Sequence, residues 1–456
     1  MTTEREKKFD WPLCDEAENL ILRYLEAFLS HHGFAHALQS RMRDETGTLF
    51  IDWVDHLVMS PAVEPELRKV GYQHEHGIET VGGQRAFWHP EAMLPRVLLD
   101  PSVSLSPFSV ALRVDSVADF FAIHDLPFHV HGTPITRYRK ATITQPQGGP
   151  ELAIVERRGY RGYVPIEHAP TTSAALLKAH ELWRTRNRNA ENDNFEETHA
   201  LLDELVSRVG RDAACHVVFA EERLFWERRN RAGQVQKRRQ DRLGLGWANH
   251  DHHTFRSSRE HFVDLMQCLE QLGFERRERY YAGAQAGWGA QILEQPVEGI
   301  VAFCDVDLEP HETEIDFSRV GLPPSKRLGT IGLWIGLHGE SFLQAGMHHL
   351  ECRFDYDLLR KQLTKENVNT MDPFSDFPFL KQAFTEGERW PVRHERANRL
   401  LKRGLIDQAQ FDKFVSEGAI GSHLENLQRK GGFKGFNQKS VSVIIQATDP
   451  RAQHAH

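Results

Sequence analysis

The chain has 456 residues, of which 40% are hydrophobic and 26% are charged, with a formal net charge of -8. This composition excludes disordered and collagen-like proteins, and the negative charge opposes nucleic-acid binding. No apolar run reaches the ~20 residues that a membrane-spanning helix needs, and the polar first ten residues are unlike a signal peptide. Five cysteines without a C-x-x-C pattern are typical of reduced thiols. We therefore expect a cytoplasmic protein that binds no nucleic acid and no membrane; its oligomeric state is unknown.

Helical and β-rich segments alternate along the chain and indicate four parts. Residues 1–48 have helical periodicity, and residues 49–165 contain short β-rich runs separated by glycine and proline. Residues 166–242 carry three amphipathic stretches, which predict a helical connector. The basic run at 228–242 is interpreted as a solvated helix face. Residues 243–456 form a second β-rich domain.

Within this last domain, one order of elements is predicted twice. The first unit is a strand, a helix and three strands, over residues 252–256, 259–272, 274–281, 288–294 and 299–307. The second unit has a strand, a helix and a closing strand, over residues 346–354, 356–365 and 422–429. Residues 374–420 are expected to add helices and loops over one face. The predicted fold class is α+β, with paired βαβββ modules that form a cupped mixed sheet.

Three polar residues occupy matching places in these units. His252 lies in the opening strand of the first unit, His349 in the opening strand of the second, and Glu425 in the closing strand. They can meet only if the two units pack together with their sheets forming one surface. Two imidazoles and one carboxylate on one face of a metal are the ligand set of non-heme Fe(II) oxygenases. Zinc hydrolases use the same residue types, so the set alone does not fix the metal.

The segments around these residues resemble the vicinal oxygen chelate superfamily over roughly residues 245–445. D-H-H-T-F from Asp251, G-M-H-H-L from Gly346 and L-E-N-L-Q-R-K-G-G-F-K-G-F-N from Leu424 are similar, in order, to the metal-binding segments of 4-hydroxyphenylpyruvate dioxygenase. The spacings from His252 to Arg256 and from His349 to Arg353 also resemble the 2-oxoadipate dioxygenase/decarboxylase family, the bacterial 2-hydroxyglutarate synthases.

The resemblance implies an Fe(II)- and O2-dependent dioxygenase that decarboxylates a 2-oxo acid, similar to 2-oxoadipate, to a shortened 2-hydroxy acid. One Fe(II) would be held by His252, His349 and Glu425. Arg256 lies two strand steps from His252 on the same face, and we expect it to bind a substrate carboxylate.

Two further residues are predicted at the site, and two neighbours are predicted to point away from it. Arg353 is a second candidate for substrate binding. Gln428 is expected to orient Glu425 or the substrate. Strand alternation predicts that His253 and His348, which adjoin the ligand histidines, point away from the metal.

Residues 49–165 are interpreted as a degenerate, metal-free copy of the paired unit. V-D-H-L from Val54 imitates the first ligand strand, but V-A-L-R-V-D-S-V from Val110 has no histidine where the second ligand belongs. An alternative register, in which His56 and His252 are the first and second ligands, stays open.

Two other functions stay open as well. The chain could be another metalloenzyme of the same superfamily, namely an aromatic 2-oxo acid dioxygenase, a ring-cleaving dioxygenase or an isomerase. It could also be a metal-free small-molecule binding protein that uses the cupped sheet as a pocket. Stoichiometric iron would separate the metalloenzymes from the binding protein.

Overall fold

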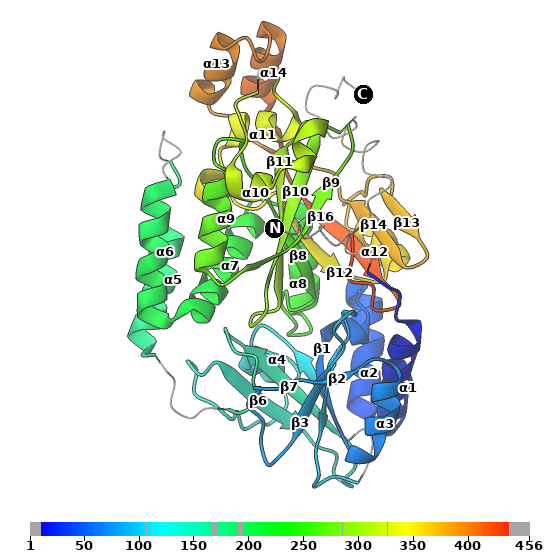
Figure 1. Ribbon diagram of the computed structural model, residues 1–456. Coiled ribbons are helices and arrows are strands. Elements are labelled where there is room, and N and C mark those ends of the chain that lie inside the picture. Colours follow the sequence, from blue (N-terminus) through cyan, green and yellow to red (C-terminus); the bar gives the residue numbers. More distant parts are fainter. Residues whose placement is uncertain are drawn as a thin grey trace.

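The computed structural model describes residues 11–104, 108–165, 171–189, 195–284, 286–325 and 327–436. These residues form two mixed β-sheets, of seven strands in the N-terminal half and nine in the C-terminal half, with helices packed around both (Figure 1). The end of the closing sequence motif, at Asn437, lies outside the described residues. Within the described ranges, no helix has the length and apolar character needed to cross a membrane.

The first unit of the C-terminal sheet has the predicted βαβββ topology. Its elements are β8 (His250–Arg256), α9 (Phe262–Gln271), β9 (Glu275–Tyr281), β10 (Trp288–Gln295) and β11 (Ile300–Asp307). Strand β11 returns to pair in parallel with β8, and β10 and β9 follow in antiparallel order. The opening and closing strands of the unit are therefore direct neighbours.

The second unit repeats this arrangement. Its elements are β12 (His349–Arg353), α12 (Tyr356–Lys365), β13 (Ser375–Phe377), β14 (Leu380–Phe384) and β16 (Ala419–Arg429). Strand β16 pairs in parallel with β12, and β14 and β13 follow in antiparallel order. Because β8 and β12 pair antiparallel in the centre, the sheet order β13-β14-β16-β12-β8-β11-β10-β9 is a symmetric one. The predicted α+β fold with paired modules is confirmed by these strand pairings.

The segment 374–420 differs from the sequence prediction of helices and loops. It contains β13, β14 and β15 (Glu388–Trp390) as well as α13 (His394–Lys402) and α14 (Gln408–Glu417). The three strands have only three to five residues each, which is too short for a clear alternating pattern in the sequence. Helices α13 and α14 pack against α11 (Thr330–His338) at one end of the molecule (Figure 1).

The N-terminal sheet has the same topology with one strand fewer in its second unit. Its strands are β1 (Val54–Met59), β2 (Gln73–His74), β3 (Arg85–Trp88), β4 (Arg96–Leu99), β5 (Ser109–Arg113), β6 (Tyr138–Ile143) and β7 (Glu151–Arg157). Strands β1 and β4 pair in parallel, β5 and β7 pair in parallel, and β1 and β5 join the units antiparallel. Its helices are α1 (Asp15–His31), α2 (Gly33–Arg41), α3 (Glu64–Lys69) and α4 (Val117–Ile123).

Helices of the connector cover the outer face of the C-terminal sheet and leave the other face as a cup. They are α5 (Ser173–Thr185), α6 (Phe195–Val209), α7 (Arg211–Glu227) and α8 (Arg231–Asp241). One apolar core joins Phe219 of α7 to Phe255, Leu350 and Leu424 of the central strands. The basic run at 228–242 has the predicted solvated face, since Arg231, Arg238 and Arg242 are exposed. The other side of α8 buries Gln236, Arg239 and Gln240, which bond to each other and to the turn after α2.

The remaining helical segments are short. They are η1 (Met42–Thr46), η2 (Phe50–Trp53), η3 (Pro61–Val63), η4 (Pro310–Glu314), α10 (Phe317–Val320) and η5 (Ser341–Ala345). The π-helical turn η5 ends at Gly346, whose φ of 78° favours glycine. The chain then enters β12, which carries candidate ligands.

Candidate metal centre

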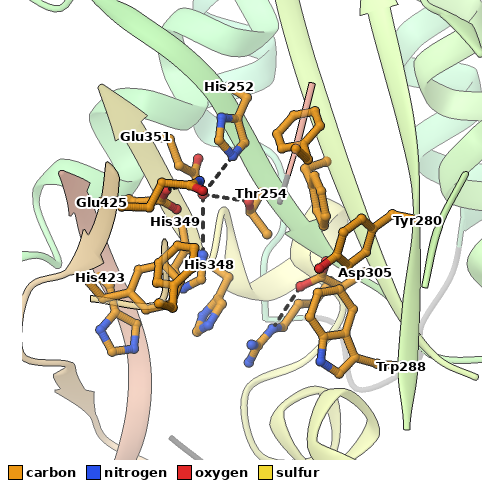
Figure 2. Close-up of a pocket in the computed structure, with 16 residues that line it drawn as sticks. His252, Thr254, Tyr280, Trp288, Asp305, His348, His349, Glu351, His423 and Glu425 are labelled. Atoms are coloured by element: carbon orange, nitrogen blue, oxygen red, sulfur yellow. Dashed lines mark hydrogen bonds and ion pairs between the residues drawn. The ribbon is translucent and has the colours of Figure 1, made fainter. Parts of the chain in front are cut away.

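A row of three side chains crosses the central strands of the cup. His252 on β8 lies opposite Glu351 on β12, and Glu351 lies beside Glu425 on β16. Paired residues on adjacent strands share one face and lie about 5 Å apart. Their potential ligand atoms consequently fall within 4.8 Å of one another (Figure 2). All three side chains are buried, so strand pairing assembles a candidate metal site.

The third member of this row is not the residue that the sequence indicates. His349 lies two residues before Glu351 on β12, and its Nδ1 is 3.4 Å from Glu351 Oε1. Its Nε2 is buried without a hydrogen-bond partner among the described residues. The structure thus brings His252 and Glu425 together as predicted and places Glu351 between them. His349 lies beside this row, in contact with Glu351.

Burial disfavours the charged form of every side chain in this row. Burial raises the pKa of Glu425 to about 8. Burial, with the charge of Glu425 as the next cause, raises the pKa of Glu351 well above its usual value. Burial lowers the pKa of His252, which keeps the imidazole neutral. A bound cation would stabilise the charged form of these two carboxyl groups. Glu351 Oε2 has no hydrogen-bond partner among the described residues, so this oxygen is available as a ligand atom.

Each side chain of the row is fixed by a neighbour. Asp251 Oδ1 is 3.0 Å from His252 Nδ1, which leaves Nε2 of that ring to coordinate. Gln382 on β14 donates to Glu425 Oε1 over 2.8 Å, and Thr254 donates to Glu351 Oε1 over 2.6 Å. Such outer contacts hold ligands in place before a metal arrives.

Asp251 is in turn clamped by an arginine. Arg429 donates from Nε and Nη2 to the two carboxylate oxygens of Asp251, each over 2.9 Å. The same guanidinium donates to the carbonyls of Phe433 and Gly435, which ties down the turn after β16. Because of this clamp, the pKa of Asp251 stays well below its usual value despite burial.

The row lies in a cavity of about 80 Å³, which has room for several water-sized groups. At the far side of this cavity Arg256 on β8 pairs with Asp305 on β11, with Arg256 Nε 3.6 Å from Asp305 Oδ2. Burial raises the pKa of Asp305 to about 7, against the opposing effect of Arg256. The predicted carboxylate-binding residue therefore faces the cavity, together with a carboxyl group that the sequence analysis did not identify.

Aromatic side chains form the remaining wall of the cavity. They are Tyr280, Trp288, Phe303, Phe374, Phe384 and Phe436. Phe436 contacts the His252 ring edge-on, with centroids 5.0 Å apart. Trp288 on β10 lines the cavity and packs its indole against Tyr280 and Phe303. This wall makes the lining of the cavity beside the row mostly apolar.

A second group of potential ligands lies beside the first. His348, His349 and His423 have ligand atoms within 4.8 Å of one another, and all three are buried. His423 precedes Glu425 by two residues and therefore shares its face of β16. His423 is a candidate site residue that the sequence motifs did not indicate, although its even separation from Glu425 is visible in the sequence.

Two predicted residues lie away from the cavity. Arg353 donates to the backbone carbonyl of Asp52 and lines a different, larger cavity of about 790 Å³ between the two halves. The side-chain oxygen of Gln428 accepts a hydrogen bond from the backbone of Tyr356. Gln428 is three residues from Glu425, which places it on the opposite face of β16. Neither residue lines the cavity of the candidate site, so the roles expected for Arg353 in substrate binding and for Gln428 in orienting Glu425 or the substrate have no support from this geometry and stay predictions.

The two adjacent histidine pairs behave differently. His253 points to the outer face, where it meets Phe219 and Arg223 of α7, as strand alternation predicts. His348 lines the cavity together with His349, and their ring centroids are 3.9 Å apart. The prediction that His348 points away is wrong because β12 begins only at His349, so the two residues are not in regular strand alternation.

The N-terminal sheet retains part of the same arrangement. His56 on β1 lies opposite Ala111 on β5, which lies beside Ala153 on β7. These positions match His252, Glu351 and Glu425, so the copy keeps the histidine and lacks both carboxylates. The ring of Tyr163 packs 4.8 Å from His56. The structure does not bring His56 near His252, which contradicts the alternative register.

The contacts of Asp251 and Arg429 that hold His252 have a counterpart in the N-terminal half. Asp55 Oδ2 is 2.7 Å from His56 Nδ1, and Arg157 clamps both oxygens of Asp55 over 2.7 and 2.8 Å. Arg157 also donates to the carbonyls of Tyr160 and Gly162, a turn beyond its strand. The two halves therefore share an Asp–His–Arg support, and among the described residues the ligands that it would serve lie in the C-terminal half.

No family model and no curated protein matches the chain. Among solved structures, methylmalonyl-CoA epimerase from Mycobacterium tuberculosis is 13% identical, with a TM-score of 0.23, over 40% of this chain and 88% of its own. A mutant of 4-hydroxymandelate synthase from Streptomyces coelicolor is 13% identical, with a TM-score of 0.23, over 88% and 97%. A xylose isomerase-like TIM barrel/4-hydroxyphenylpyruvate dioxygenase fusion protein is 12% identical, with a TM-score of 0.24, over 91% and 56%. At these scores the likenesses carry no argument, and the fold is established by the strand registers alone.

Proposed function

We propose that the chain is an Fe(II)- and O2-dependent dioxygenase that decarboxylates a small 2-oxo acid. The observation that carries this proposal is the buried row of His252, Glu351 and Glu425, with its two carboxyl groups, in a small cavity that also contains Arg256. Imidazole and carboxylate are ligands that suit Fe(II). The orphaned Glu351 Oε2 fits a cation at this place. The resemblance of the ligand segments to 2-oxo acid dioxygenases supports the choice of reaction.

Fe(II) bound to this row would supply a Lewis acid with open positions for a 2-oxo acid and the redox chemistry of O2. The residues of the chain would bind the substrate, orient the ligands and exclude water. Arg256 would hold a substrate carboxylate by charge-assisted hydrogen bonds. Asp251 fixes the tautomer of His252, and Gln382 keeps the Glu425 carboxylate turned toward the row. The aromatic wall excludes water from the reacting groups.

His349 is an alternative third ligand. It is the residue that the sequence motif indicates, and its Nδ1 is 3.4 Å from the oxygen of Glu351 that lies nearest to it. Glu351 is preferred because its oxygen already lies with the ligand atoms of His252 and Glu425.

Metal analysis with O2 uptake tests the proposal. Metal-free protein is reconstituted with Fe(II) under anaerobic conditions and desalted, and O2 consumption is then measured against a panel of short 2-oxo acids. We expect about one tightly bound iron per chain, and loss of both iron and O2 uptake in Glu425→Gln and His252→Ala. Loss of iron in Glu351→Ala but not in His349→Ala would assign the third ligand to Glu351, and the reverse result would assign it to His349.

Three results would contradict the proposal. Retention of iron by all four variants would place the metal elsewhere. Iron binding without O2 uptake on any 2-oxo acid would favour a metal-dependent isomerase, and the absence of metal binding by folded wild-type protein would favour a small-molecule binding protein. His253→Ala is the matched control, because His253 is buried on the same strand but faces α7.

A further inference from the structure

We propose that His348, His349 and His423 form a second cation site, which takes a transition-metal ion that prefers nitrogen ligands, such as Zn(II) or Co(II). The inference rests on the proposed function in one respect, since it assigns Glu351 and not His349 to the first site. We call the row of His252, Glu351 and Glu425 the carboxylate site, and the three histidines the histidine site. The two sets then have no residue in common.

Backbone geometry brings the three rings together. His349 and His423 are register partners on the parallel strands β12 and β16. His348 precedes β12, and its carbonyl accepts a hydrogen bond from the backbone N–H of His423. The ring centroids are 3.9 Å apart for His348 and His349 and 5.2 Å apart for His349 and His423. The ligand atoms of all three fall within 4.8 Å, so one ion can reach every ring.

Hydrogen bonds on the far side of two rings fix the tautomer that coordination needs. His348 Nδ1 is 2.8 Å from the carbonyl oxygen of Gly421, and His423 Nδ1 is 2.8 Å from the carbonyl oxygen of Thr385. A carbonyl oxygen only accepts, so each Nδ1 carries the hydrogen and each Nε2 keeps a lone pair. Metal-binding histidines are supported in this way, by a backbone carbonyl or carboxylate at the other nitrogen.

The third ring has an unsatisfied atom. Nε2 of His349 is buried and has no hydrogen-bond partner among the described residues, while the side chain as a whole is 7% exposed. Leaving a buried polar atom unpaired costs about 1–3 kcal/mol. A purely structural histidine cluster would carry this cost without compensation. A cation shared by the three rings removes it.

The surroundings suit a cation of this class. Three imidazoles with an open position are the ligand set of tri-histidine zinc sites. Glu351 lies between the two sets, with Oε1 3.4 Å from His349 Nδ1 and 3.8 Å from His252 Nε2, and supplies negative charge to both. On the other side, the guanidinium of Arg256 contacts Asp305, with Nε 3.6 Å from Oδ2.

Cobalt binding to the metal-free, untagged full chain tests this inference. Equilibrium dialysis against Co(II), followed by metal analysis, should give two ions per chain in the wild type. His423→Gln and His348→Gln should each lower this number to one, and Glu425→Gln should also lower it to one because the histidine site remains. His253→Gln is the control and should keep two. Circular dichroism shows which variants are folded.

The failure of this inference and the failure of the proposed function give different results. One Co(II) in the wild type, lost in Glu425→Gln but kept in His423→Gln, removes the histidine site and leaves the carboxylate site intact. One Co(II) that is lost in both variants shows a single site made from both sets, and also overturns the inference. One Co(II) that is kept in Glu425→Gln and lost in His423→Gln supports the histidine site and contradicts the proposed ligand role of Glu425.

Discussion

Glu351 and His252 are direct cross-strand neighbours at the centre of the C-terminal sheet, with Glu351 Oε1 3.8 Å from His252 Nε2. The contact joins the opening strands of the two βαβββ units, which lie far apart in the sequence. Each unit by itself has an incomplete ligand set. The pairing of β8 with β12 therefore creates the candidate metal centre, and side chains around it determine how well the set is oriented.

Gln382 should contribute to metal affinity through Glu425. Its amide donates to Glu425 Oε1 over 2.8 Å, and loss of an outer-sphere partner typically weakens metal binding ~10–100-fold. We therefore expect Gln382→Ala to raise the Kd for Fe(II) or Co(II) by about this factor. Isothermal titration of the metal-free protein measures it.

Gln428→Ala is the matched control for this change. Gln428 is on the same strand as Glu425 but on its other face, where it bonds to the backbone of Tyr356. We expect an unchanged Kd for the metal. If Gln382→Ala and Gln428→Ala weakened metal binding equally, the effect would be a general loss of packing. Gln382 would then have no role in orienting Glu425.

The metal-free protein should lose stability as pH rises. The folded pKa of Glu425 is raised by burial from 4.5 to about 8, so the folded state binds a proton more tightly than the unfolded state does. The contribution of this group is favourable below pH 4.5 and declines as pH rises toward 8. Between these limits the free energy of unfolding of the metal-free chain should fall more steeply than that of Glu425→Gln, which cannot titrate.

Urea unfolding at several pH values measures this difference. Added Co(II) should reverse the loss in the wild type, because the cation stabilises the deprotonated carboxylates. Parallel pH profiles of the metal-free wild type and Glu425→Gln would show that Glu425 is already ionised without metal. The carboxylate pair would then need a different source of compensation.

Arg256→Lys should weaken substrate binding and spare the metal. The guanidinium faces the cavity beside Asp305 and offers a planar fork that an ammonium group does not replace. We expect KM for the best 2-oxo acid to rise about tenfold or more, because the loss of one charge-assisted hydrogen bond weakens binding by about this factor. The iron content should not change. Steady-state O2 uptake measures KM. An unchanged KM would remove Arg256 from substrate binding.

The sequence was sufficient to predict the repeated units and the face of each central strand. Sequence patterns located α9, α12, β10 and β11 closely, because each helix buries one face and the two strands are long and almost wholly buried. The choice between His349 and Glu351 could not be made in this way. Both residues share one face of β12, and only the long-range register with β8 decides which of them lies opposite His252.

The other differences have separate causes. Gln428 lies on the opposite face of β16 because its separation from Glu425 is odd, a signal that the sequence contains. The cavity position of His348 depends on where β12 begins after the π-helical turn, which composition does not reveal. Asp305 was not predicted because its importance depends on the pairing of β11 with β8.

The Asp–His–Arg support occurs in both halves, so the effect of one substitution on stability and on metal binding can be compared between them. Asp251 and Asp55 each bond to Nδ1 of a histidine and to both donor nitrogens of an arginine clamp. Removing one partner of a buried ion pair typically costs about 3–5 kcal/mol. We therefore expect Asp251→Asn and Asp55→Asn to lower the free energy of unfolding by similar amounts.

Only one of the two variants should affect the metal. His252 has Glu351 and Glu425 beside it, so Asp251→Asn should weaken metal binding ~10–100-fold through the orientation of His252. His56 has two alanines in those places, so Asp55→Asn, and likewise His56→Ala, should leave the metal Kd and the iron content at wild-type values. Titration of both variants at a temperature where each is folded separates the effects. If Asp55→Asn weakened metal binding as much as Asp251→Asn, the N-terminal half would take part in the metal site, and its interpretation as a metal-free copy would have to be abandoned.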